Sequence, residues 1–124
     1  MKTETINLER VRDAQIRTIM RDKNLSDIQK NILLTLVYSN PLWIADLGVK
    51  RIMRKGENVI ILHTKNAGVT INVEIVYSKA KDLYDVKFYR LNRRLEPVTR
   101  EVEDVFFEEL YPLLQSQISK MVIG

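Results

Sequence analysis

The chain of 124 residues contains no cysteine and one histidine, His63. Without cysteine it can form no disulfide, hold no metal through thiolates and use no cysteine nucleophile. A zinc site needs three or four converging ligands, and a single histidine with no cysteine supplies few of those that zinc prefers. We therefore expect no metal site. A chain without cysteine also suits a reducing compartment, so we expect a cytoplasmic protein.

Long apolar stretches are also missing. The longest runs, such as 32–34 and 59–62, are far shorter than the roughly 20 residues that span a membrane. Residues 1–12 are polar and mixed in charge, without the apolar segment of a secretory signal. We expect neither a signal peptide nor a membrane partner.

Glycine is sparse, and its four positions lie far apart along the chain. None of them forms the glycine-rich loop that cradles phosphates in nucleotide-binding proteins. His63 lies near the end of an expected strand, with no partner beside it that would make a nucleophile and base pair. The sequence therefore predicts a protein that is not an enzyme, with no catalytic residue and no cofactor.

The periodicity of the apolar residues predicts a single α+β domain over 1–124. Residues 6–22 and 27–38 repeat apolar side chains at helical spacing, and Asn40-Pro41 ends the second helix. Residues 1–44 therefore form a helical N-terminal part. The remaining part, 46–121, is expected to combine a β-meander with a C-terminal helix.

From residue 49 onward the apolar period changes to two, which is typical of strands. Short turns separate the strands, so they form an antiparallel meander. Residues 95–103 are ambiguous, but alternation at Val98, Arg100 and Val102 favours a short fifth strand, giving four or five strands. A helix over 104–121, capped by Asp104 and kinked or split by Pro112, is expected to end the fold. The expected strands cover 49–55, 59–65, 69–77 and 83–91.

Four segments carry a resemblance to a group of known proteins. They are Asp46–Lys50, which contains Leu-Gly-Val-Lys; Thr70–Val76; Asp82–Leu91, which contains Tyr-Asp-Val; and Val102–Phe106. In this order of motifs, about 46–118 resembles small uncharacterised bacteriophage proteins. The chain departs from them in its helical extension 1–44 and in Arg93-Arg94. The resemblance implies a phage or prophage accessory protein in the bacterial cytoplasm and implies no activity.

Positive charge is concentrated in the middle of the chain. Residues 49–95 carry eleven basic and four acidic side chains, whereas 96–124 carry two and six. Clustered cations attract nucleic-acid phosphates, so we expect a DNA- or RNA-binding basic face on the sheet. The alternative is a solubilising face that the acidic C-terminal segment partly neutralises. The candidate binding residues are Lys50, Arg51, Arg54, Lys55, Lys87, Tyr89, Arg90, Arg93 and Arg94.

Two further hypotheses compete with nucleic-acid binding. Asp85 and Lys87 point to the same side of a strand and, with Glu74 on the neighbouring strand, match a metal-dependent nuclease pattern, although alternating charges on a wet strand face are common. The other alternative is a protein-binding module or host-factor inhibitor that acts as a homo-oligomer. Free strand edges would support it. Trp43 is either an anchor for a partner or a core residue between helix and sheet.

Overall fold

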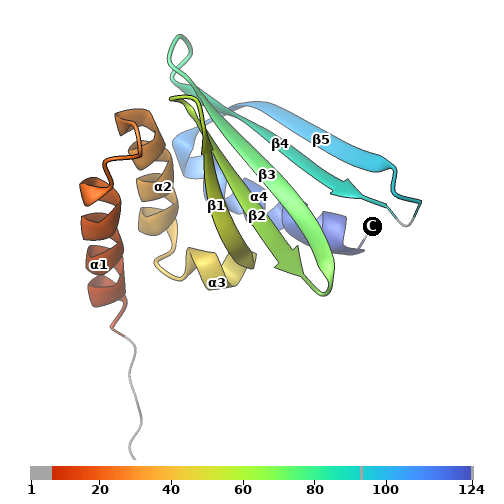
Figure 1. Ribbon diagram of the computed structural model, residues 1–124, viewed down its shortest axis with the longest axis horizontal. Coiled ribbons are helices and arrows are strands. Elements are labelled where there is room, and N and C mark those ends of the chain that lie inside the picture. The colour runs from red at the N-terminus through yellow and green to blue at the C-terminus, as the bar shows by residue number, and fades with distance from the viewer. Residues whose placement is uncertain (1–6, 93, 124) are drawn as a thin grey trace, which may run out of the picture.

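The computed structural model describes residues 7–92 and 94–123, which form four helices and five strands (Figure 1). The strands lie in one sheet in the order β1-β2-β3-β4-β5, and every neighbouring pair is antiparallel. The expected α+β fold is confirmed, including two N-terminal helices, a five-stranded meander and a C-terminal helix. The elements are α1 (Leu8–Arg21), α2 (Asp27–Ser39), α3 (Trp43–Leu47), β1 (Val49–Lys55), β2 (Val59–Asn66), β3 (Val69–Ser78), β4 (Leu83–Leu91), β5 (Pro97–Val105) and α4 (Phe107–Ile123).

The start of α2 is fixed by a capping box. The Ser26 hydroxyl accepts a hydrogen bond of 3.0 Å from the Gln29 backbone N–H, and the Gln29 side chain accepts one of 3.0 Å from the Ser26 N–H. The amide nitrogen of Gln29 also donates to the carbonyls of Gly56 and Val59, at 3.0 Å each. One buried polar side chain therefore caps the start of the helix and ties it to the β1–β2 hairpin.

The short helix α3 was not expected from the sequence. It places Trp43 in the core with 1% of its surface exposed, and the indole Nε1 donates to the Gln15 side chain on α1 at 2.9 Å. Of the two interpretations of Trp43, the core residue is correct. Since the ring is buried, it is not a surface anchor for a partner.

The expected cap of the last helix is wrong. Asp104 lies in β5 with a φ of 58°, at an irregularity where the β4–β5 register shifts, and α4 begins only at Phe107. Aspartate is one of the few residues that tolerate a left-handed backbone, so the residue type fits a bulge as well as a cap. Pro112 does not split α4, which runs as one helix from Phe107 to Ile123 and buries Tyr111 and Leu114 on either side of the proline.

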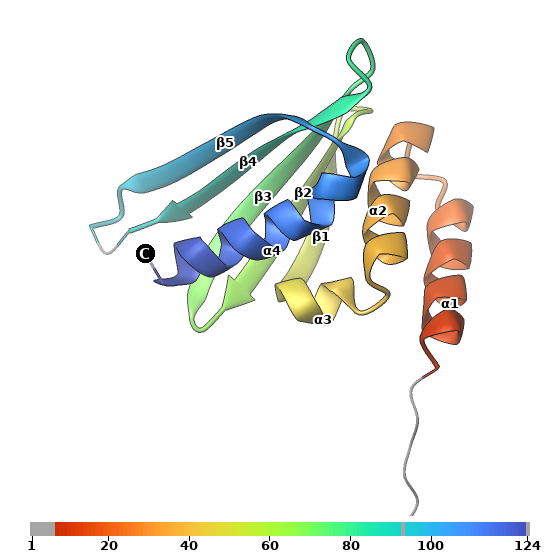
Figure 2. The same cartoon turned by 180° about the vertical axis from the view of Figure 1, so that it is seen from behind.

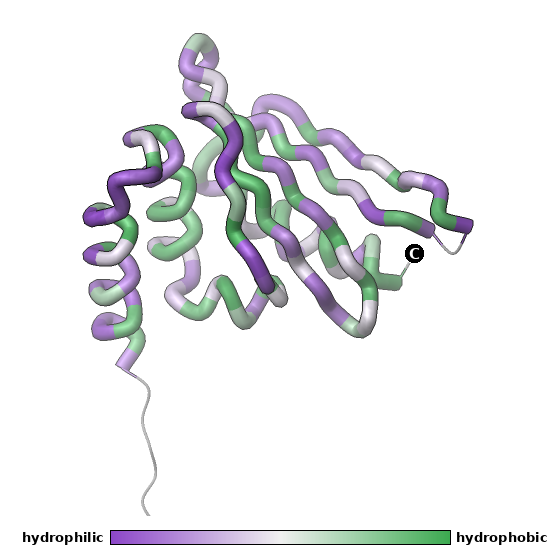
Figure 3. Tube along the Cα trace, in the orientation of Figure 1, coloured by the Kyte–Doolittle hydropathy of each residue, from purple (hydrophilic) through white to green (hydrophobic). Residues whose placement is uncertain are grey.

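The helices α2, α3 and α4 lie on one face of the sheet, while α1 packs on α2 and stands outermost (Figures 1 and 2). None of the described helices covers the opposite face, which we call the open face. Figure 3 shows hydrophobic and hydrophilic residues alternating along the strands, as one buried face and one open face require. The side chains that face the helices are almost fully buried and include Ile60, Leu62, Ile71, Val73, Ile75, Val86 and Phe88.

Candidate nucleic-acid interface

The strand register divides the predicted binding residues between the two faces of the sheet. Residues that lie opposite each other in neighbouring strands share a face. Arg54 lies opposite the core residue Ile60, and Arg90 opposite Val98 on the same helix-covered face. Four of the predicted residues lie on the open face instead, namely Arg51, Lys55, Lys87 and Tyr89.

The remaining candidates lie at edges and in loops. Lys50 is exposed at the irregularity of β1, and Arg94 is exposed in the β4–β5 connection. Arg93 lies outside the described residues. Arg90 is half-buried, unlike the exposed cations of β1. The structure therefore does not bring all nine residues onto one face, and the largest group of them is on β1.

The cations of β1 and β2 are exposed and have no acidic partner. Within 7–92 and 94–123, the ion pairs are Arg12–Asp13, Lys81–Asp85, Lys81–Asp104 and Lys87–Glu101, so none involves β1 or β2. Lys87, by contrast, lies 3.4 Å from Glu101 and is partly neutralised. We define the basic edge as the exposed residues Lys50, Arg51, Arg54, Lys55 and Lys65.

Lys65 was missed by sequence reasoning. It lies opposite Thr70 on the open face, next to the start of β1, where its N–H donates to the Gly48 carbonyl at 2.9 Å. The signal was present, because Lys65 is two residues after His63 and strand residues two apart share a face.

The basic edge continues toward the α1–α2 connection. The guanidinium of Arg54 donates to the backbone carbonyl of Asn24, and the neighbouring Lys23 is exposed. This contact fixes the direction of Arg54 and brings a further cation of the N-terminal part close to β1.

The acidic C-terminal segment does not neutralise these cations. Glu101 and Asp104 on β5 pair with Lys87 and Lys81, which lie on β4 and on the hairpin before it. The first turn of α4 carries Glu108 and Glu109, and Glu108 lines a cavity beside α2. The carboxylates of β5 that form these ion pairs lie at the opposite edge of the sheet from β1.

Among the described residues, few aromatic side chains lie near the basic edge. Tyr89 is half-buried on β4, three strands away from β1, which is roughly 14 Å at the ordinary strand spacing. His63 is nearer, but its Nδ1 lies 2.8 Å from the Asn72 side-chain oxygen. Among the described side chains, the basic edge therefore offers several phosphate contacts and, beside them, only the His63 ring for stacking.

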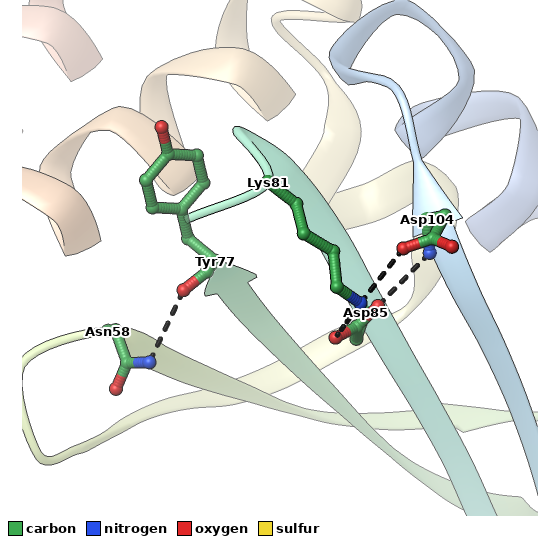
Figure 4. A network of polar contacts seen from close by, with 5 residues as sticks. All are labelled: Asn58, Tyr77, Lys81, Asp85 and Asp104. Atoms are coloured by element: carbon green, nitrogen blue, oxygen red, sulfur yellow. Dashed lines mark hydrogen bonds and ion pairs between the residues drawn. The ribbon is translucent and has the colours of Figure 1, made fainter. Parts of the chain in front are cut away.

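Asp85 stabilises the bulge of β5, and it also lines a small cavity of about 230 Å³ together with Glu74 and Lys87. Its carboxylate accepts the Asp104 N–H at 3.0 Å and lies 4.0 Å from the Lys81 ammonium, which is also 3.0 Å from the Asp104 carboxylate (Figure 4). The hydrogen bond to Asp104 raises the pKa of Lys81. Among the residues that the structure describes, no group of three or more metal-binding side chains is present. Glu74, Asp85 and Lys87 thus lie together as the nuclease pattern predicts, but the described residues form no metal-binding cluster there, and the nuclease hypothesis stays a prediction.

Comparisons with protein-family models, with curated proteins and with solved structures each find no match. Within the described part of the chain, no helix has the length and apolar character required to cross a membrane.

Proposed function

We propose that this protein binds the phosphate backbone of nucleic acid through the basic edge. The observation that carries the proposal is the set of five exposed cations on β1 and β2 without an acidic partner among the described residues. Lysine and arginine that neutralise phosphates release counterions from the nucleic acid, and this release supplies affinity.

The extended shape of β1 suits this role. A strand rises about 3.3 Å per residue, so Lys50 to Lys55 extend over roughly 17 Å, the length of about five base-pair steps. Arg51 and Lys55 project to the open face and Arg54 to the other side, so the cations border the free edge of the sheet. A backbone lying along this edge can contact several of them at once.

The chemistry of the edge favours backbone recognition over base recognition. Phosphate contacts carry no sequence information, and among the described residues the aromatic ring beside β1 on the open face is that of His63, which is hydrogen-bonded to Asn72. Binding should therefore depend weakly on sequence. The resemblance to bacteriophage proteins is our reason for proposing an accessory role in a bacterial cell.

The test measures binding of the full chain to labelled single- and double-stranded DNA and RNA, at about 50 and 200 mM salt with Mg²⁺ present. With about four phosphate contacts, affinity should fall roughly 100-fold between the two salt concentrations. Arg51→Glu/Lys55→Glu should abolish binding. The matched control is Arg10→Glu/Lys120→Glu, which changes the net charge by the same amount at exposed positions of α1 and α4. This control should retain most of the binding to nucleic acid.

No binding at about 50 mM salt would overturn the proposal, and so would an equal loss in the two double variants. Cleavage of the label that is lost in Asp85→Asn would instead revive the nuclease hypothesis.

A second candidate is self-association or protein binding along the strand edges. The observation that favours it is that β1 and β5 each have a neighbour on one side only. Free edges can pair with strands of another chain, and charged side chains on them oppose such pairing. Sedimentation of the protein alone, over a range of concentrations and salt, distinguishes this candidate, because backbone pairing does not weaken steeply with salt.

A further inference from the structure

A cavity of about 920 Å³ lies between α2, the β3–β4 hairpin and the start of α4. Its volume falls within the range of small-molecule sites. One side of α2 lines it from Ile28 through Leu34 to Tyr38, which is roughly 15 Å of helix. This side is distinct from the one that buries Ile32 and Leu36 in the core.

Four aromatic rings line this cavity. Tyr77 and Tyr84 come from the hairpin, with ring centroids 5.6 Å apart and planes inclined by 59°. Figure 4 shows the Tyr77 ring directed away from the polar network of Lys81. Tyr38 of α2 and Phe107 of α4 also line the cavity and are each 63% exposed, so both rings keep a large uncovered surface.

The charges around the rings are mainly negative. Asp82 and Glu108 line the cavity, with Lys79 as the single basic residue among the lining residues described. The Tyr77 hydroxyl donates a hydrogen bond to the Asp82 carboxylate, which holds that charge beside the aromatic wall. Aromatic faces carry negative electrostatic potential, so rings and carboxylates together favour a cation.

We propose that this cavity binds a small organic cation, a tertiary or quaternary ammonium carried on an apolar body. A small anion would meet two carboxylates, and an uncharged apolar ligand would bring them no opposite charge. An ammonium with apolar substituents satisfies both the rings and the carboxylates. None of the lining residues belongs to the basic edge, so this site is independent of the proposed nucleic-acid function.

The experiment compares two ligands that differ in charge but not in shape. Choline carries a trimethylammonium group, and 3,3-dimethylbutan-1-ol is its uncharged isostere; benzyltrimethylammonium is a second cation with a larger apolar body. Titrations are followed by amide chemical shifts of the full chain in NMR spectra. We expect choline to bind about 10-fold more tightly than the alcohol, and benzyltrimethylammonium more tightly still. The shifting amides should be those of α2, the β3–β4 hairpin and the start of α4.

Adjacent phenylalanines supply a matched control. Phe107 lines the cavity, whereas Phe106 is similarly exposed, at 53%, and is not among the lining residues. Phe107→Ala should weaken binding of the cations about 5-fold or more, and Phe106→Ala should leave it unchanged. Asp82→Asn should also weaken it, and asparagine tolerates the φ of 55° at this position. Lys79→Ala should strengthen binding, because it removes a like charge.

Three results would overturn the proposal. The first is no saturable binding of either cation. The second is equal affinity for choline and the alcohol, which would indicate an apolar cavity without charge preference. The third is an equal effect of Phe106→Ala and Phe107→Ala, which would place binding elsewhere. Unchanged dispersion of the NMR spectrum establishes that each variant is folded.

Discussion

The backbone N–H of Asp104 donates a hydrogen bond of 3.0 Å to the carboxylate of Asp85 across β4 and β5. The bond lies at the shift in register, where Val102 is opposite Val86 but Val105 is opposite Tyr84. Asp104 adopts a φ of 58° there, and the strand then turns toward α4. Asp85, which belongs to the nuclease-like pattern in the sequence, therefore stabilises a bend in the chain.

This role predicts the effect of substitutions at Asp85. Asp85→Ala leaves the Asp104 N–H without its acceptor and should lower the free energy of unfolding by about 1 kcal/mol. Asp85→Asn keeps an acceptor oxygen and should cost less. Urea denaturation of both variants tests this order. Equal stability of Asp85→Ala and the wild type would show that the bulge does not need the carboxylate.

Gln29 is the strongest candidate for a large loss of stability. Its side chain is 1% exposed and makes hydrogen bonds to the backbone of Ser26, Gly56 and Val59. Gln29→Ala leaves these groups unpaired at the junction of α2 and the β1–β2 hairpin, so we expect a loss of about 2–3 kcal/mol. Chemical denaturation measures it. Gln115→Ala, at an exposed position of α4, is the control and should cost less than half as much.

Tyr111 predicts a loss of stability at alkaline pH. Burial raises its pKa, and so does the hydrogen bond that its hydroxyl donates to Asp46. The unfolded tyrosine ionises from pH 10 upward while the folded one keeps its proton, so the unfolded state is favoured as the pH rises. The melting temperature should fall more steeply between about pH 9 and 11 in the wild type than in Tyr111→Phe. Parallel curves for the two proteins would contradict this assignment.

The sheet could be predicted from the sequence because apolar and polar residues alternate along its strands with a clear period of two. In β3, Ile71, Val73 and Ile75 are fully buried and Asn72 and Glu74 are not, as the alternation predicts. The five-residue helix α3 was missed because so short an element shows no period, and no side chain caps its start. Asp104 was misassigned because aspartate favours both helix caps and left-handed bulge positions.

The candidate site was less predictable because it depends on pairing between strands. The irregularity between Val49 and Arg51 in β1 changes which residues face the helices. Counting every second residue from Val49 therefore assigns Arg54 to the wrong face of the sheet. Whether a cation is neutralised depends equally on its neighbours: Lys87 lies beside Glu101, while Lys55 has no such partner among the described carboxylates. Charge totals along the chain could indicate a basic region but not which of its cations are unpaired.

Arg51 and Arg54 are three residues apart on β1, and the structure predicts that they differ in their effect on folding. The Arg54 guanidinium donates to the Asn24 carbonyl and joins the strand to the α1–α2 connection, whereas Arg51 lies exposed on the open face opposite His63. Arg54→Ala should therefore lower the free energy of unfolding by about 1 kcal/mol, and Arg51→Ala should change it by less than about 0.5 kcal/mol. Both should weaken nucleic-acid binding and reduce its dependence on salt, by about one phosphate contact each. Urea denaturation and salt titrations of the same two proteins separate the roles. If Arg51→Ala proves as destabilising as Arg54→Ala, its loss of binding reflects folding, and Arg51 does not belong in the interface.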